Sequence, residues 1–235
     1  MRLTRRTLLA GGAAMIAGAR AWANTTLTMG DMSVDTLSDG NLMLPFEFQF
    51  GGLPEEETRD ILGRYGIEGD MMEPPCNLTL MRDGTNTVLF DAGAGPNFMP
   101  SAGKLWEALD MLGVDPGDVT HVVFTHAHPD HLWGVLDDFD DLVFYNATHM
   151  IGRAERDYWL DPATPDSIGE ERMAFAAGAI RHLGALDGAL DVFEDGAEIL
   201  PGIAARMTPG HTPGHMSFEL RSGDDLDVLL WTDKD

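Results

Sequence analysis

The apolar residues of this chain fall mainly into short runs and alternating segments, which are typical of strands. Apolar and polar residues alternate over 216–220 and again over 226–230, on either side of the turn Ser222-Gly223-Asp224. This region is therefore predicted to be a hairpin with one apolar face. A second hairpin is predicted for 76–81 and 87–90, around Asp83-Gly84. Further strands are expected at 26–28, 32–37, 120–124, 142–146, 192–193 and 203–207.

Several segments between these strands have apolar residues at helical spacing. The apolar residues of 102–112 fall on one face of a helix, for which Ser101 is the expected N-cap. Helices are also expected at 55–65, 149–159 and 167–183. Segment 41–52 fits either a strand or a substrate-facing loop, because Phe46, Phe48 and Phe50 alternate in it. Mixed strands and helices without a linker or repeat predict one α/β domain, with helices on the outer face of a sheet.

The first 23 residues have the pattern of an export signal. Thr4-Arg5-Arg6-Thr7-Leu8-Leu9 is similar to a twin-arginine signal, and Ala21-Trp22-Ala23 fits a cleavage site. The apolar stretch between them is too short to span a membrane, and an uncleaved amphipathic anchor is the alternative. The sequence therefore predicts a twin-arginine-type signal peptide at 1–23 and one folded domain at 24–235. The mature protein is expected in the periplasm or outside the cell, with no stable membrane association.

The chain is strongly acidic, with a formal net charge of −24. Signal cleavage would remove four arginines (Arg2, Arg5, Arg6 and Arg20) and no acidic residue, so the mature chain carries about −28. Such a surface repels nucleic acid and anionic lipid, and the expected partner is a small-molecule substrate. Cys76 is the only cysteine, which excludes an internal disulfide, and it is expected to be buried and inert. The sequence does not indicate an oligomeric state.

Potential metal ligands are concentrated in the segment Thr125-His126-Ala127-His128-Pro129-Asp130-His131. It directly follows the apolar run Val122-Val123-Phe124, so its ligands lie on the turn that leaves a buried strand. In layered α/β proteins this edge of the sheet is where sites are usually built. His126 and His128 are two residues apart and can face the same way, while Asp130 and His131 begin a helix on the other side. Nitrogen and carboxylate donors at this density suit zinc or another divalent ion.

A second histidine segment, Pro209-Gly210-His211-Thr212-Pro213-Gly214-His215, lies between two predicted strands. His211 is expected to complete a three-histidine set with His126 and His128. His215, at the start of a strand, is instead expected to bond the turn backbone. The remaining three are expected to be structural or exposed: His121, His149 and His182.

Together these motifs resemble the metallo-β-lactamase-fold hydrolase superfamily, nearest to its methyl parathion hydrolase-like and lactonase-like group. The resemblance rests on H-x-H-x-D-H, an upstream Asp91-Ala92-Gly93, a later G-H-T-P-G-H and an aspartate after the last strand. It implies an αββα sandwich with one or two Zn²⁺ ions, or another divalent metal, between the sheets. The implied ligands are His126, His128 and His211 for one ion and Asp130 and His131 for the second, with Asp233 bridging. Asp235 is a weaker candidate for the bridge, and Asp91 is implied to be a buried carboxylate supporting the ligand loops.

One departure from the family concerns the end of the sequence. The family supplies a further histidine well after the bridging aspartate, and no histidine follows His215 here. The expectation is a domain that lacks its C-terminal strands and helix, as in an incomplete or truncated product.

The resemblance implies metal-assisted hydrolysis, in which a metal-bound hydroxide attacks an ester, lactone or phosphotriester. Asp130 is the expected catalytic residue, because it can orient the nucleophile or pass a proton to the leaving group. An apolar wall of the substrate site is one interpretation, and core packing the other, for Phe46, Phe48, Phe50 and Trp133.

Two alternatives remain open at the level of sequence. One is a non-catalytic or truncated metal-binding protein, which the missing histidine favours. The other is a thioesterase similar to glyoxalase II, in which G-H-T also occurs.

Overall fold

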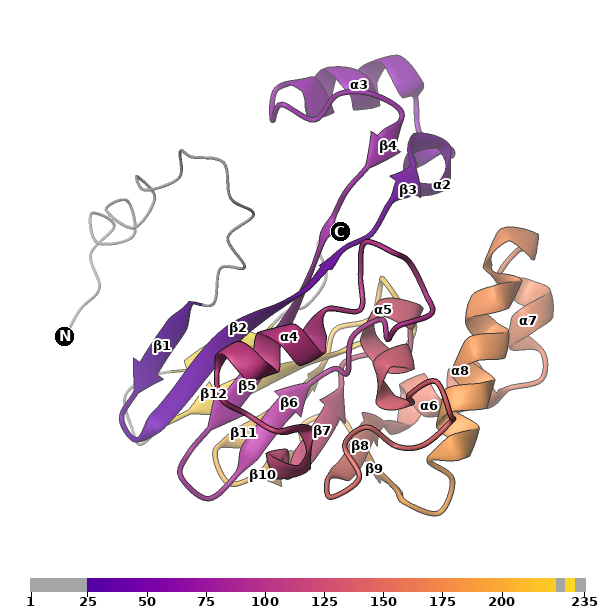
Figure 1. Ribbon diagram of the computed structural model, residues 1–235. Coiled ribbons are helices and arrows are strands. Elements are labelled where there is room, and N and C mark those ends of the chain that lie inside the picture. Colours follow the sequence, from indigo (N-terminus) through magenta and orange to yellow (C-terminus); the bar gives the residue numbers. More distant parts are fainter. Residues whose placement is uncertain (1–24, 223–226, 231–235) are drawn as a thin grey trace.

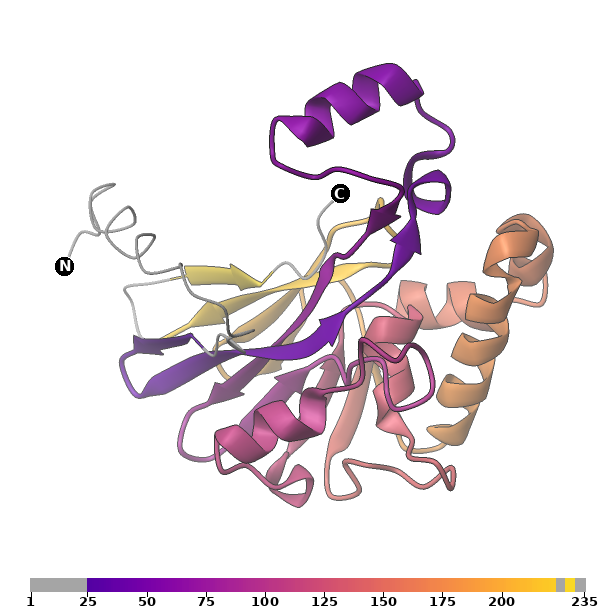
Figure 2. The same cartoon turned by 45° about the horizontal axis from the view of Figure 1, so that its top comes forward.

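The computed structural model describes residues 25–222 and 227–230. Two sheets pack face to face, and a layer of helices covers the outside of the larger one (Figures 1 and 2). The larger sheet has the order β1(Thr26–Met29), β2(Met32–Asn41), β5(Pro75–Arg82), β6(Thr87–Phe90), β7(His121–Phe124), β8(Thr148–Gly152) and β9(Leu190–Phe193). The smaller contains β10(Glu198–Leu200), β11(Ile203–Met207), β12(Met216–Arg221) and β13(Asp227–Leu230). This arrangement confirms the predicted layered α/β sandwich.

Strand direction explains where a site can form. The strands β1, β2, β5 and β6 pair antiparallel, whereas β6, β7, β8 and β9 run parallel. The carboxyl ends of the parallel strands therefore meet at one edge, where α5(Pro129–Leu132) follows β7 and α6(Arg153–Leu160) follows β8. The layer also contains α4(Leu105–Met111), α7(Thr164–Ser167), α8(Met173–Ala185) and the 3₁₀ turns η1(Pro116–Asp118), η2(Trp133–Val135) and η3(Glu170–Arg172).

The larger sheet is buried on both faces, which explains its continuous apolar runs. In β7, Val122 and Phe124 point into the core beneath the helices, while Val123 points into the core between the sheets. Phe90 of β6 and Phe218 of β12 join the two sheets, with ring centroids 5.0 Å apart. Both predicted hairpins are confirmed in the described residues, at β5–β6 and β12–β13.

An arm built from residues 44–72 projects from the sandwich (Figures 1 and 2). It contains β3(Leu44–Pro45), α2(Phe46–Phe50), α3(Glu55–Gly63) and β4(Met71–Met72), and α3 confirms the helix expected at 55–65. The expectation of a strand or loop for 46–50 was wrong. Phe46 and Phe50 contact each other across one helical turn, with ring centroids 5.3 Å apart. Residues four apart lie on the same face of a helix, so this contact favours a helix although the phenylalanines recur at every second position.

Three other element boundaries differ from expectation. Segment 142–146 is a turn whose Phe144 is fully buried, and the strand next to β7 is β8, which occupies the start of the helix expected at 149–159. This apolar run is therefore buried without pairing with a strand of the larger sheet. The helix α4 begins at Leu105 and not after Ser101, because the Asp39 carboxylate accepts the Leu105 amide proton at 2.7 Å. The helix expected at 167–183 is divided by Gly169, whose φ of +87° no helix accommodates.

The expected signal peptide at 1–23 and the expected bridging residues Asp233 and Asp235 lie outside the described residues. Within the described part of the chain, no helix combines the length and apolar character needed to cross a bilayer.

Candidate metal centre

Three histidines from two distant loops meet at the carboxyl edge of the larger sheet. His126 and His128 lie in the turn between β7 and α5, and His211 lies in the turn between β11 and β12. One ring nitrogen of each lies within 4.8 Å of the others. Nδ1 of His128 and Nε2 of His211 are 2.7 Å apart. The structure therefore brings together the three-histidine set expected from the sequence.

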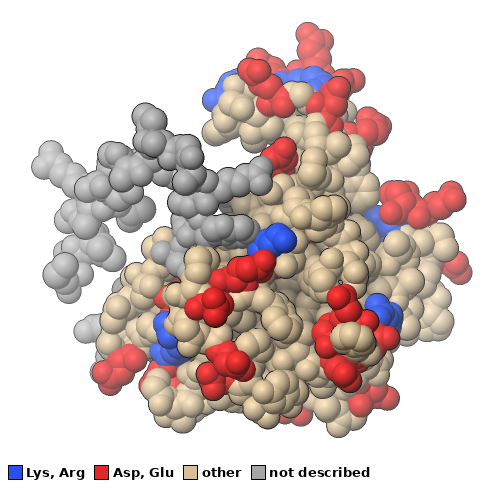
Figure 3. Space-filling view, viewed as in Figure 1, with Lys and Arg blue, Asp and Glu red and all other residues tan. Residues whose placement is uncertain are grey.

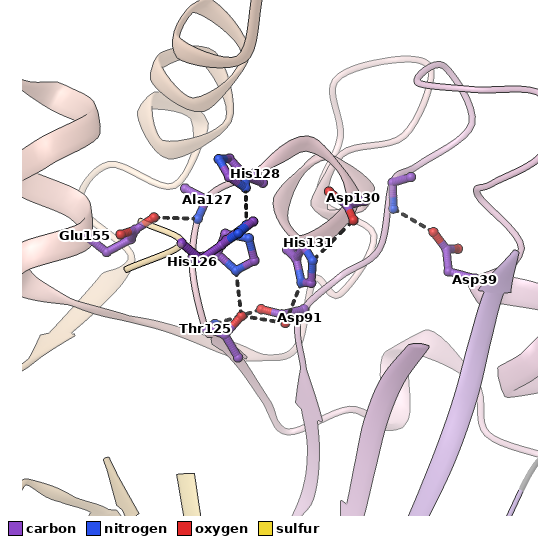
Figure 4. Close-up of polar contacts among 11 residues, drawn as sticks. Asp39, Asp91, Thr125, His126, Ala127, His128, Asp130, His131 and Glu155 are labelled. Carbon is purple, nitrogen blue, oxygen red and sulfur yellow. Dashed lines mark hydrogen bonds and ion pairs between the residues drawn. The ribbon is translucent and has the colours of Figure 1, made fainter. Parts of the chain in front are cut away.

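Asp130 and His131 lie beside this set on α5 (Figure 4). Their facing atoms, Oδ2 of Asp130 and Nε2 of His131, are 3.3 Å apart. The ring centroids of His126 and His131 are 4.0 Å apart, so this pair adjoins the three histidines. The arrangement offers one carboxylate oxygen and one imidazole nitrogen next to a site of three imidazoles.

Asp91 is a buried carboxylate beneath both groups of ligands (Figure 4). Its Oδ1 accepts the Thr125 amide proton at 2.7 Å, and its Oδ2 accepts the Thr125 hydroxyl proton at 2.8 Å. Oδ2 also lies 2.8 Å from Nδ1 of His131. Asp91 adopts a φ of +65°, a conformation that aspartate tolerates better than most residues. It therefore holds the ligand loop in the supporting role expected from the sequence.

The same contacts select the tautomers of two histidines. Because the Thr125 hydroxyl donates to Asp91, it accepts from Nδ1 of His126, 2.9 Å away. The proton of His126 therefore sits on Nδ1, and Nε2 carries the lone pair that a metal ion needs. Asp91 likewise draws a proton to Nδ1 of His131, which directs Nε2 toward Asp130.

The surroundings also shift the pKa values of His126 and His131 in opposite directions. Burial, together with the neighbouring histidines, lowers the pKa of His126 well below its usual value and keeps its ring neutral. Burial also disfavours charge on His131, yet Asp130 and Asp91 raise the pKa of His131 well above its usual value. A neutral His126 ring close to the carboxylates of Asp130 and Asp91 is a suitable environment for a cation.

The donor set fits a divalent transition metal. Zinc binds imidazole nitrogen at about 2.0–2.1 Å and takes carboxylate oxygen as well, usually four ligands in all. Within residues 25–222 and 227–230, the three histidines form the one group of three or more potential ligands close enough to share an ion. Asp130 and His131 extend the donors on one side, as a second ion requires.

Glu155, a residue that sequence reasoning missed, ties the two ligand loops together from α6, and Figure 4 shows its contact with Ala127 in the first of them. Its fully buried carboxylate accepts the Ala127 amide proton at 2.9 Å and the Thr212 hydroxyl proton at 2.6 Å. Burial raises the pKa of Glu155, and these hydrogen bonds oppose the rise. No sequence signal identified it, because its partners lie in other segments.

A cleft of about 640 Å³ opens onto the histidines. His128, Asp130, His131 and His211 lie in its floor, and its walls come from the arm and from the helices α6 to α8. The walls carry an aromatic and aliphatic group next to polar residues such as Gln49, Asn77 and Arg172; the apolar group is Leu44, Phe48, Phe98, Tyr158, Trp159 and Phe175. Ring centroids place Phe175 5.7 Å from His128 and 6.2 Å from Phe48, so Phe175 joins the wall to the floor.

Of the four aromatic residues considered for this wall, only Phe48 lines the cleft. Phe46 is buried in the arm, where the Arg59 guanidinium lies 4.0 Å from its ring centroid. Trp133 stacks on His182 at 5.4 Å in the helical layer. For Phe46, Phe50 and Trp133, packing is therefore the correct interpretation.

The other histidines lie in structural settings. The His215 ring is fully buried, and its Nδ1 lies 2.9 Å from the Thr208 hydroxyl on the opposite strand end. His149 is buried in β8, and burial lowers its pKa to about 4. His182 places Nδ1 2.7 Å from the Gly178 carbonyl oxygen within α8.

Known sequences resemble this chain over part of its length. The profile of the metallo-beta-lactamase superfamily matches residues 72–226. The N-acyl homoserine lactonase AttM of Agrobacterium fabrum is 35% identical over 130 residues, which are 54% of this chain and 45% of that protein. An N-acyl homoserine lactonase of Bacillus thuringiensis is 27% identical over 135 residues, 57% of this chain and 46% of that protein. The matched part spans about half the length of these curated relatives.

Solved structures resemble the chain over a larger share of its length. AidC, a dizinc quorum-quenching lactonase, superimposes with a TM-score of 0.79 at 23% identity, covering 88% of this chain and 72% of that one. The hydrolase AbOPH superimposes with a TM-score of 0.77 at 25% identity, covering 90% of this chain and 74% of that one. Both likenesses support the sandwich architecture described above.

Proposed function

The chain belongs to the metallo-beta-lactamase superfamily, and from that premise we propose that it is a metal-dependent hydrolase. The observation that carries the proposal is the convergence of His126, His128 and His211, of which His128 and His211 line the cleft and His126 is buried next to them. These residues would hold one Zn²⁺ ion, and Asp130 and His131 would hold a second. Another divalent metal fits the same donors. Asp233, outside the described residues, remains the candidate for the bridging carboxylate.

The aromatic part of the cleft favours a substrate with an apolar portion. Its walls place Phe48 and Phe175 within reach of a molecule bound over the histidines. Because the matched relatives are named N-acyl homoserine lactonases, an N-acyl lactone is the first substrate to test. Other esters and phosphotriesters share the same electrophilic chemistry and are the next candidates.

When bound, the ions make hydroxide available near neutral pH and polarise the carbonyl or phosphoryl oxygen of the substrate. The residues of the chain prepare this chemistry. Asp91 and Thr125 fix the proton on Nδ1 of His126 and so keep Nε2 directed to the site. The Asp130 carboxylate, half-buried at the cleft floor, would orient the nucleophile or pass a proton to the leaving group.

The charge of the chain and its first residues bear on its binding partner and on its location. Acidic side chains are spread over the face seen in Figure 3, which supports a small molecule and not nucleic acid as the partner. The twin-arginine-like segment 4–9 supports export of the folded protein to the periplasm or beyond.

The proposal is tested by metal content and by hydrolysis across a panel of lactones, esters, phosphotriesters and lactoylglutathione. We expect zinc in the purified protein, lactone hydrolysis, and loss of at least about 100-fold in kcat/KM for His126→Ala. The matched control is His121→Ala, at the opposite end of β7, which is expected to retain activity. Zinc binding without turnover on any substrate would favour a non-catalytic metal-binding protein. Selective turnover of lactoylglutathione would favour a thioesterase.

A further inference from the structure

We propose that Glu155 is a positioning residue that holds the two histidine loops in register, so that their imidazoles converge on a common ion. The inference rests on the proposed function. It concerns a buried carboxylate that belongs to neither histidine motif and comes from a third element, α6.

Glu155 acts first on the loop that follows β7. Its Oε1 accepts the amide proton of Ala127 at 2.9 Å (Figure 4). Ala127 lies between His126 and His128, so this bond fixes the peptide that joins two of the three imidazoles. Because both side chains pivot on that peptide, its orientation decides whether the two rings face the same point.

The second oxygen acts on the loop between β11 and β12. Oε2 accepts the Thr212 hydroxyl proton at 2.6 Å and the Gly214 amide proton at 3.2 Å. Thr212 directly follows His211, so this bond anchors the loop next to the third imidazole. One carboxylate group thus spans loops that are separated by more than 80 residues in the chain.

Glu155 also fixes an aromatic neighbour of the cluster. Its Oε1 accepts the indole proton of Trp159 at 2.6 Å, one turn farther along α6. The Trp159 ring lies with its centroid 5.6 Å from that of His128. The same carboxylate therefore sets both the backbone beside His128 and the surface against which the His128 ring packs.

The geometry requires a carboxylate at this position. A carboxylate offers about four acceptor sites, and four donors surround this one: Ala127, Trp159, Thr212 and Gly214. A glutamine would place an amide NH₂ against at least one of these donors. Gly214 has no side chain to keep the loop away, since a Cβ there would lie 2.1 Å from the Glu155 backbone nitrogen. The loop is therefore built to approach α6 closely.

The test is the affinity of the full chain for Zn²⁺, measured by competition with a chelating dye. Glu155→Ala is expected to weaken zinc affinity by about 10–100-fold, the usual effect of removing a residue that orients metal ligands. Glu155→Gln is expected to weaken it less. Thr212→Val removes a single hydroxyl donor, and its expected loss is about 2–10-fold. These two milder variants provide the measurement if Glu155→Ala does not fold.

A matched control separates positioning from general stability. Asp35 is another fully buried carboxylate, bonded to Arg82 at 2.7 Å on a strand away from the histidines. Asp35→Asn is expected to lower the free energy of unfolding but to leave zinc affinity unchanged. If Glu155→Gln and Thr212→Val both bind zinc as tightly as the wild type, the inference about Glu155 is wrong, while the proposed function stands. Failure of the wild-type chain to bind zinc would overturn the proposed function and the inference with it.

Discussion

Nδ1 of His128 and Nε2 of His211 lie 2.7 Å apart, although 83 residues separate them in the chain. The contact joins the loop after β7 to the loop between the strands of the smaller sheet, so the candidate metal centre bridges the two sheets. Neither loop holds the cluster alone. The position of each imidazole therefore depends on how the sheets pack and on the buried carboxylates beneath the loops.

Asp91 is expected to control the protonation pattern of the cluster. Asparagine tolerates the positive φ of this position, so Asp91→Asn changes the hydrogen bonding without adding backbone strain. Asparagine has one acceptor oxygen where Asp91 has two, so its NH₂ group must face donors that Asp91 accepts from. If the NH₂ group faces the Thr125 hydroxyl and Nδ1 of His131, the imidazoles lose the contacts that select their tautomers. We expect zinc affinity to fall about 10–100-fold. Imidazole ¹⁵N NMR shifts report the tautomers directly, and unchanged shifts in the variant would refute this role.

Asp39 is expected to make stability depend on pH. Burial raises its pKa from 3.8 to about 6, although backbone amide protons of Ala94 and Leu105 stabilise the charged form. Since the folded pKa lies above the unfolded one, the folded state binds more protons between about pH 4 and 6. This group therefore favours folding at acidic pH, and its contribution is lost as pH rises through 6. The full effect is about 3 kcal/mol, because each pKa unit corresponds to about 1.4 kcal/mol.

The measurement is urea unfolding of the wild type and Asp39→Asn at several pH values between 4 and 7. The variant loses hydrogen bonds at every pH, but it does not titrate. Its free energy of unfolding relative to the wild type is therefore expected to rise with pH across this window. A difference that stays flat or falls would show that Asp39 titrates below the window.

Phe175 is expected to determine substrate length. Its ring joins His128 at the floor of the cleft to Phe48 in the arm, so it lies along the path of an apolar chain. For Phe175→Ala we expect KM for long-chain N-acyl lactones to rise about 10–100-fold, since burying such a chain against a ring contributes about 1.5–3 kcal/mol and each 1.4 kcal/mol is a factor of ten. Short-chain lactones and kcat should change less.

The control for this variant is Phe139→Ala, since Phe139 is 85% exposed on a loop that does not line the cleft. It should leave KM unchanged for every chain length. Equal effects of Phe175→Ala on short and long chains would argue that the ring supports the floor and does not contact the chain.

The sequence predicted the parts of this molecule that depend on local pattern. The apolar run Val122–Phe124 indicated a strand buried on both faces, and the histidines after it indicated the edge at which a site forms. The pattern was misleading where apolar residues are buried without belonging to a paired strand. Phe144 is buried from a turn, and Phe46 and Phe50 pack within a short helix that their alternation concealed.

The supporting residues were harder to predict. Glu155 lies in a helix that carries several other charged residues, and nothing in its sequence context distinguishes it from them. It is identified only by hydrogen bonds to loops that the fold brings to it. The motifs reveal the residues that would touch the metal, whereas the residues that orient these ligands become visible only when tertiary contacts are known.

The most direct test of the account is the crystal structure of the zinc-loaded protein with an anomalous map at the zinc absorption edge. We predict a peak with nitrogen atoms of His126, His128 and His211 at about 2.0–2.1 Å. A map with no peak among these three residues, or with the ring of His211 turned away from a zinc ion held elsewhere, would contradict the shared metal centre.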